Sequence, residues 1–379
     1  MSRNKAEEDP STLLDQATIL LQTGQPEVGL SLAERALEIS PDGTPVALQA
    51  LNLTAEIYVE LGEIETAREH FLRAVKLDPE GEIPESEGGG AEKFLWLAQL
   101  SEEGGADSVR WFERGVTVLR RVIQSLEQRG GTEDTTSLEE KKKKLANALC
   151  GVVEIYMTDL SWEDDAETRC ESLVTEALLV APESPECLQT LASVRISQLK
   201  TDDAKAALRR SLDIWRDLAP EDIRVPDFPT RISLSRLLME VQMENEALEV
   251  LERLVLEDDQ SVEALYLGGW CLYLLGEKGE SASAESSAQS EQERRQSTLH
   301  SSRDWLKASL KLYELIDYED ERLKEHALEL VHNLDKELGE DTNDDSDAGE
   351  DEKEDVDEDG WEDEIEANDS DDDEEMKDS

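Results

Sequence analysis

Three aromatic residues near position 270 carry the most distinctive side-chain chemistry of this sequence. Tyr266, Trp270 and Tyr273 stand four and three residues apart, so on a helix they form one continuous stripe. Such a stripe is suited to stacking on arginine side chains or to gripping an extended peptide. The same stripe also fits the core beneath a following helix, and the sequence leaves both interpretations open. The chemistry that it offers is recognition.

The sequence contains no comparable pattern for catalysis. The motifs of phosphate-binding loops, dinucleotide folds, zinc peptidases and nucleophile elbows are absent. Carboxylates are so abundant that acidic pairs are expected by chance. Cys150, Cys170, Cys187 and Cys271 lie far apart at small or apolar positions, which favours reduced core thiols. We therefore expect no catalytic residue, no metal site, no cofactor and no small-molecule substrate.

Charge is the strongest signal in the composition. The chain has 93 acidic and 38 basic residues, for a net charge of −55. Residues 339–379 hold 24 of the acidic residues against Lys353 and Lys377, which leaves −33 on the first 338 residues. Such a field repels nucleic acid and anionic membranes and attracts basic proteins. A basic protein is thus the expected partner, although an acidic tail can also serve solubility alone.

A recurring spacing of small residues predicts the helices that position these side chains. Intervals of 4, 3 and 5 residues recur at Gly29-Ala33-Ala36-Pro41, Ala67-Phe71-Ala74-Pro79 and Cys170-Val174-Ala177-Pro182, and without the proline at Ala204-Leu208-Ser211. Small residues let two helices approach closely, and the proline ends the second helix. The spacing is typical of tetratricopeptide repeats. It predicts an all-α, right-handed superhelical solenoid whose concave face binds other polypeptides.

A 34-residue register divides residues 10–338 into about seven units and a capping helix. The predicted units are 10–43, 48–81, 94–128, 138–181, 185–218, 228–261 and a split seventh unit. The seventh has helices at 262–275 and 300–318, separated by a polar insertion, 276–297, which we expect to be disordered. We expect the glycine-rich connector 81–90 to loosen the array. Residues 321–338 form an amphipathic pattern typical of a cap.

The two ends of the chain lack the pattern of a packed domain. Residues 1–9 are expected to be flexible, and residues 339–379 to form a disordered acidic tail. The first residues contain no apolar signal core, and the longest apolar stretch, 265–275, is too short to span a bilayer. We expect a soluble intracellular protein. The lysine run Lys141–Lys144 fits either a nuclear import patch or a solvated helix face, and it is too isolated to indicate nucleic-acid binding.

The register also predicts which residues face a partner, because first-helix positions 2, 5, 9 and 12 point inward in this repeat family. The predicted partner-binding residues are Asn52 and Glu56 in the second unit, Glu186 and Gln189 in the fifth, and Glu263, Tyr266, Trp270 and Tyr273 in the seventh. Repeat domains that grip a chaperone's C-terminal carboxylate carry Lys or Arg and Asn at positions 5 and 9. Glu56 at position 9 would repel a carboxylate, so that function is disfavoured.

Over its full length the sequence resembles the dedicated assembly chaperones of the fourth large-subunit ribosomal protein. The shared features are a short polar N-terminus, about seven repeats on the spacing given above, a strongly acidic body and the serine-acidic run from Asp341 to Ser379. The resemblance implies that the chain binds the long internal loop of the newly made ribosomal protein. It also implies protection from aggregation and degradation and escort into the nucleus, hence a location in cytoplasm and nucleus. An acidic trough would mask the client's dense Lys and Arg residues.

Two other functions remain open from the sequence. A scaffold subunit of a multi-protein assembly would use its acidity only for solubility, and its binding would depend little on salt. A histone chaperone would lose binding when the acidic tail is deleted.

Overall fold

The computed structural model describes residues 8–129, 135–278 and 288–339, and within these ranges all regular structure is helical. Fourteen of the fifteen α-helices in the described ranges follow one another as seven pairs, as the spacing predicted. The pairs are α1 (Pro10–Gln22) with α2 (Pro26–Ile39), α3 (Pro45–Glu60) with α4 (Ile64–Leu77), α5 (Glu92–Gln99) with α6 (Gly105–Arg129), α7 (Thr135–Met157) with α8 (Ala166–Val180), α9 (Pro185–Ser197) with α10 (Thr201–Trp215), α11 (Phe228–Glu240) with α12 (Glu244–Glu257), and α13 (Val262–Lys278) with α14 (Ala288–Ile316). The last helix, α15 (Glu321–Leu338), packs on α13 and α14 as the predicted cap.

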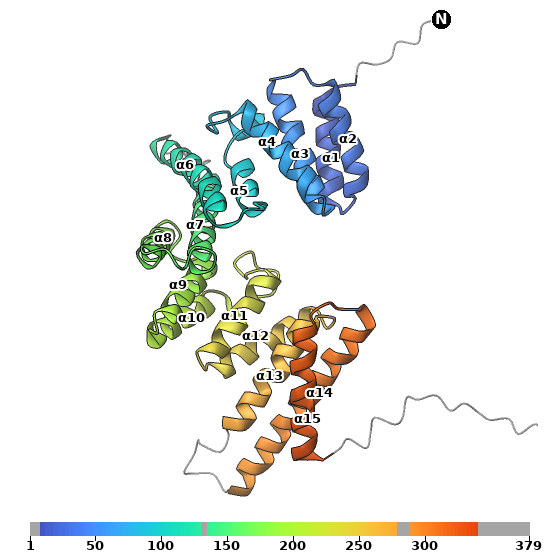
Figure 1. Cartoon of the computed structure of the whole chain (residues 1–379), viewed down its shortest axis with the longest axis vertical. Coiled ribbons are helices and arrows are strands. Elements are labelled where there is room, and N and C mark those ends of the chain that lie inside the picture. Colours follow the sequence, from blue (N-terminus) through green and yellow to red (C-terminus); the bar gives the residue numbers. More distant parts are fainter. Residues whose placement is uncertain (1–7, 130–134, 279–287, 340–379) are drawn as a thin grey trace, which may run out of the picture.

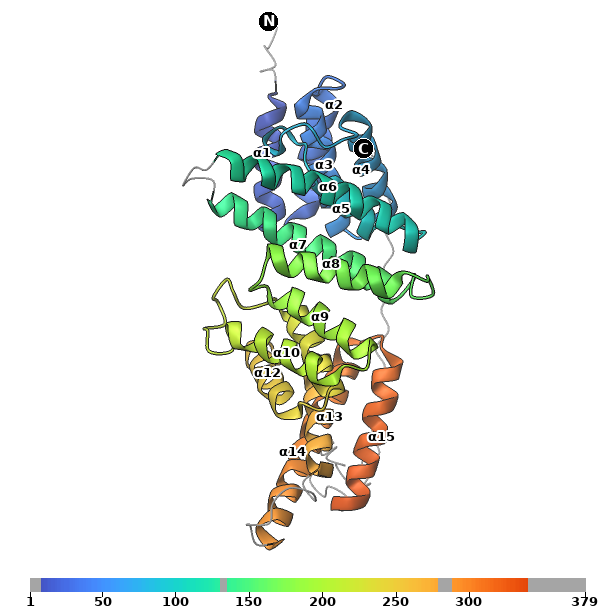
Figure 2. The same cartoon turned by 90° about the vertical axis from the view of Figure 1, so that its left-hand side faces the viewer.

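The pairs stack into one curved array, with α1 and α2 at one end and α15 at the other (Figure 1). In the central units α6 and α8 lie on the outer side of their partners α5 and α7. The view from that side brings α6, α8 and α10 to the front (Figure 2). The first helix of each central unit therefore faces the inner side of the curve.

In four of the pairs, the first helix begins with the same N-capping arrangement. A polar side chain at the N-cap accepts a hydrogen bond from a backbone N–H of the first turn, and a proline follows in that turn, where its missing N–H costs nothing. The capping residues are Asp9 of α1, Thr44 of α3, Ser184 of α9 and Asp227 of α11. These caps fix where the inner helices start.

The small residues that define the repeat spacing are buried between helices. Ala33, Ala67, Ala177 and Ala204 are fully buried. At Gly29 an added Cβ would lie 3.2 Å from the carbonyl oxygen of Ala17, so only a very small residue fits there. Close approach of the paired helices is thus the physical origin of the pattern.

The buried apolar side chains form two large clusters. One extends from α3 to α9, and the other from α9 to α15. Both use α9: Cys187 and Val194 belong to the first cluster, and Ala192 belongs to the second. The core is therefore divided along α9 rather than at a linker.

The split seventh unit is more helical than the sequence pattern predicted. α13 continues to Lys278 and α14 starts at Ala288, whereas the predicted helices were 262–275 and 300–318. Packing explains the extension, because Gly276 lies against the buried Leu299. Arg295 also donates to the carbonyl of Gly276 and pairs with Glu337 of α15. Disorder was therefore the wrong expectation at 276–278 and 288–297, and residues 279–287 lie outside the described ranges.

The connector between the second and third units is tightly held, so the expectation that it loosens the array is wrong. Lys93 Nζ lies 2.8 Å from Asp78 Oδ2, and both side chains are almost fully buried. Lys93 also donates to the carbonyl of Gly90, and Asp78 accepts from the backbone of Glu82 and Ile83. Burial lowers the pKa of Lys93 in spite of its carboxylate partner. This buried ion pair therefore helps to hold the connector in place.

Residues 1–7 and 340–379 lie outside the described ranges, so the predicted flexible N-terminus and acidic tail remain predictions. Among the described helices, none is both long and apolar enough to cross a bilayer. The four cysteines are buried thiols, as predicted.

Candidate binding groove

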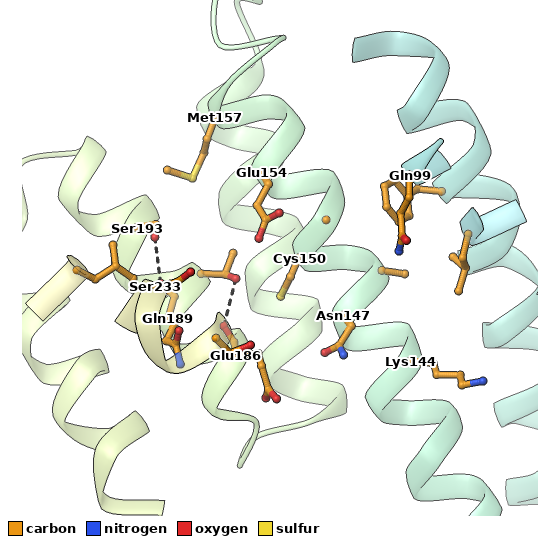
Figure 3. Close-up of a pocket in the computed structure, with 17 residues that line it drawn as sticks. Gln99, Lys144, Asn147, Cys150, Glu154, Met157, Glu186, Gln189, Ser193 and Ser233 are labelled. Atoms are coloured by element: carbon orange, nitrogen blue, oxygen red, sulfur yellow. Dashed lines mark hydrogen bonds between the residues drawn. The ribbon is translucent and has the colours of Figure 1, made fainter. Parts of the chain in front are cut away.

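A groove with a volume of about 570 Å³ crosses the inner side of the central units (Figure 3). Most of its lining comes from the first helices α5, α7, α9 and α11. Its uncharged polar side chains are Gln99, Asn147, Gln189, Thr190, Ser193, Thr230 and Ser233. Apolar side chains such as Leu95, Phe112, Met157 and Leu237 lie among them. Such a surface can hydrogen-bond to a main chain and bury apolar side chains.

Among the described residues that line the groove, three carry charge: Lys144, Glu154 and Glu186. Lys144 pairs with Glu92. Glu186 accepts a 2.8 Å hydrogen bond from Ser184 Oγ and lies 3.8 Å from Lys143 Nζ. Glu154 is more than a third exposed, yet the surrounding wall removes enough water to raise its pKa. The floor of the groove is thus less acidic than the sequence suggested.

Gln189 is the predicted site residue that lies deepest in this groove. Its side chain is 6% exposed, and its Nε2 has no hydrogen-bond partner among the described residues. An amide group offers both a donor and an acceptor, as a peptide unit does. A buried donor without a partner is costly, so a peptide carbonyl brought to it by a small side-chain adjustment would be bound favourably.

Asn52, one of the two predicted residues of the second unit, lies under the chain's own connector. Asn52 Nδ2 donates to the carbonyl of Gly88 at 2.6 Å, and Gln49 Nε2 donates to the carbonyl of Ser86 at 2.7 Å. The short helix η1 (Glu85–Glu87) therefore lies on the inner face of α3. Glu56, one turn beyond Asn52, is largely buried, and this burial raises its pKa to about 7.

The aromatic stripe on α13 packs on the capping helix. Tyr266 is buried, and its hydroxyl lies 2.6 Å from Nδ1 of His326 on α15. The Trp270 ring meets the same imidazole edge to face, with 5.0 Å between centroids. Tyr273 is half-buried, and Glu263 pairs with Arg236 at 2.5 Å.

The stripe also faces open space. Tyr266 and Trp270 line a second hollow of about 520 Å³ between α11, α13 and α15. The following helix α14 packs on a different face of α13, where Trp305 lies against Gly268 and Leu306 against Gly269. Of the two interpretations that the sequence left open, packing beneath α14 does not describe Tyr266 and Trp270, which contact α15 and face the hollow.

The predicted residues thus fall into three groups rather than one site. Glu186 and Gln189 lie in the central groove, Asn52 and Glu56 on α3, and the other four on α13. Sequence reasoning missed the contribution of α7, because its unit is elongated and gave no secure register. The spacing of Lys144, Asn147, Gly151 and Glu154, three or four residues apart, was the available signal.

The helix pairs and the inner groove define a repeat protein that binds polypeptides. In agreement, residues 14–82 match the tetratricopeptide-repeat family model. The chain is 59% identical over 383 aligned residues to the probable assembly chaperone of rpl4 of Emericella nidulans, covering 100% of this chain and 94% of that one. It is 34% identical over 308 residues to the protein of the same name in Schizosaccharomyces pombe, with 80% and 84% covered.

A solved structure agrees with these relatives. The assembly chaperone of RpL4 (Acl4), residues 1–338, matches with a TM-score of 0.67 and 57% identity, over 72% of this chain and 99% of that chain. The chain belongs to the family of assembly chaperones of rpl4.

Proposed function

We propose that the chain is a dedicated chaperone of newly made rpl4, the fourth large-subunit ribosomal protein. It binds the long internal loop of this client on its inner face, protects the client from aggregation and degradation, and escorts it from the cytoplasm into the nucleus. Membership of the chaperone family supports the client's identity. It also supports a binding role rather than an enzymatic one.

The observation that carries the mode of binding is the groove across four inner helices. Amide and hydroxyl side chains follow one another there from α5 to α11, so an extended segment can be held along its backbone. The net charge of −33 on residues 1–338 attracts a basic client over a longer range and speeds its association. The groove thus binds the client segment at short range, and the negative charge of the chain attracts the client at long range.

The test measures binding of purified rpl4 to the full chain by isothermal titration calorimetry. Ser233 is exposed on α11 and lines the groove, so Ser233→Arg places a bulky cation in the path of the client. Ser31 is exposed on α2 and is not part of the groove lining, so Ser31→Arg is the matched control with the same change of charge.

We expect Ser233→Arg to weaken binding at least tenfold and Ser31→Arg to leave it within twofold of wild type. Higher salt should weaken the wild-type complex. Failure of the wild-type chain to bind rpl4 would refute the proposed client. Equal binding by the two variants would show that the groove is not the site.

The proposed location in cytoplasm and nucleus has its own test. A fluorescent fusion of the full chain should be found in both compartments, and depletion of rpl4 should lower its nuclear fraction. A fusion confined to the cytoplasm throughout would contradict escort into the nucleus.

A further inference from the structure

The four consecutive lysines of α7 form ion pairs with carboxylates on four neighbouring elements. All four contact carboxylates: Lys141 with Glu85 of η1 at 2.5 Å, Lys142 with Glu127 of α6 at 3.7 Å, Lys143 with Glu186 of α9 at 3.8 Å, and Lys144 with Glu92 of α5. Lys141 is buried, whereas the side chains of Lys143 and Lys144 are 59% and 44% exposed. The run is therefore neither a free basic patch nor a simple solvated face.

Two of these ion pairs stand at the groove. Lys144 lines it, and so does Glu186, the partner of Lys143. The carboxylates around Lys142, from Glu127 and Glu139, are not among the lining groups. The run thus places Lys144 in the groove lining and Lys143 beside the lining residue Glu186, whereas Lys142 pairs with carboxylates outside the groove.

The surroundings of Lys144 hold more negative than positive charge. Glu92 of α5 pairs with it, Glu56 of α3 lies close to both, and Glu85 and Glu140 add to the negative field. Burial, with a smaller contribution from repulsion by Glu92, raises the pKa of Glu56 to about 7. A further cation entering this place would meet the Glu92 carboxylate, whose ion pair with Lys144 it could replace.

We propose that Lys143 and Lys144 are exchangeable internal counter-ions, which basic side chains of the bound segment displace from Glu186 and Glu92. The inference deepens the proposed function and takes only the client's identity from it. Exposed lysine–carboxylate pairs contribute little to stability, so their exchange is cheap. An arginine can bind a carboxylate through two parallel N–H groups and therefore competes well with lysine.

The exchange has a consequence for release. In the empty chaperone the two lysines keep Glu186 and Glu92 paired, and they return to these carboxylates when the client leaves. They therefore lower the affinity for basic segments and make the complex reversible. Removal of an internal counter-ion should tighten binding and slow dissociation.

The test compares Lys144→Met with Lys142→Met in the full chain, because both remove one positive charge from α7. The probes are purified rpl4 and a synthetic twelve-residue peptide that alternates arginine with glycine and serine. At low salt we expect Lys144→Met to bind both probes three- to tenfold more tightly, with slower dissociation. Lys142→Met should stay within twofold of wild type. Circular dichroism and melting temperature establish that each variant is folded.

Lys143→Met provides a second variant, since its exposed side chain makes the longest of these contacts and its loss does not threaten the fold. It should change affinity in the same direction as Lys144→Met. If both groove variants bind like Lys142→Met, the exchange does not occur, even when rpl4 remains the client. If the arginine peptide shows the expected order but wild type does not bind rpl4, the exchange holds and the proposed client is wrong.

Discussion

Glu56 should make the stability of this chain depend on pH in a way that one substitution removes. Each pKa unit corresponds to about 1.4 kcal/mol. A carboxyl whose pKa rises from 4.5 to about 7 on folding therefore destabilises the folded chain by roughly 3 kcal/mol once it is ionised. The cost is absent below pH 4.5, grows between pH 4.5 and 7, and is complete above this range. Glu56→Gln abolishes it.

The expected gain from Glu56→Gln is thus about 2 kcal/mol larger at about pH 8.5 than at about pH 5.5. Urea unfolding followed by circular dichroism at the two pH values measures this difference, and the comparison cancels the titration of all other groups. Glu69→Gln, at an exposed position of α4, is the matched control and should show no such dependence. If the two variants respond to pH alike, Glu56 is hydrated and the account of its surroundings is wrong.

Four further predictions concern packing and binding. Lys93→Met should destabilise the chain by about 3 kcal/mol in thermal or urea unfolding, because it leaves a buried carboxylate unpaired; an unchanged midpoint would contradict the closed connector. Gly268→Val should cost about 2 kcal/mol or more, since its side chain would overlap the indole packed there, and an unchanged melting temperature would refute this close contact. Trp270→Ala should weaken rpl4 binding by about 2 kcal/mol and Glu263→Gln by about 0.5 kcal/mol, as measured by calorimetry. If the Trp270→Ala variant is folded and binds rpl4 normally, the aromatic stripe serves only the packing of the helices. Truncation after Gly339 should slow association but leave binding detectable, whereas complete loss at low salt would make the tail the recognition element.

The sequence predicted the helix pairs well because their signal is local. Small residues such as the buried Ala67 and Ala177 let two helices approach closely, so the spacing reports the fold directly. The connector was misjudged because long-range contacts hold it, among them the buried pair of Asp78 with Lys93 and the hydrogen bond from Asn52 to Gly88, and no periodicity reveals such contacts. The start of α14 was missed for a similar reason, since Arg295 supports it through polar contacts with other helices.

The candidate site was less accessible to sequence reasoning. The sequence correctly predicted that Glu186 and Gln189 of α9 face inward, because their unit follows the 34-residue register without insertion. The contribution of α7 was missed because its helix is longer than the register allows. The ion pairs of Lys143 and Lys144 join helices that are far apart in sequence, and only the folded array brings them together.

The division of the buried core along α9 has a mechanical consequence. Each apolar cluster packs its own set of helices together, and α9 is the element that contributes to both. Bending at the boundary between the clusters should disturb less buried apolar surface than bending within either of them, and the groove lies across that boundary. A client segment seated there would contact helices on both sides of the boundary and oppose such bending. Occupied and empty forms should then differ in elasticity even where their average shapes agree.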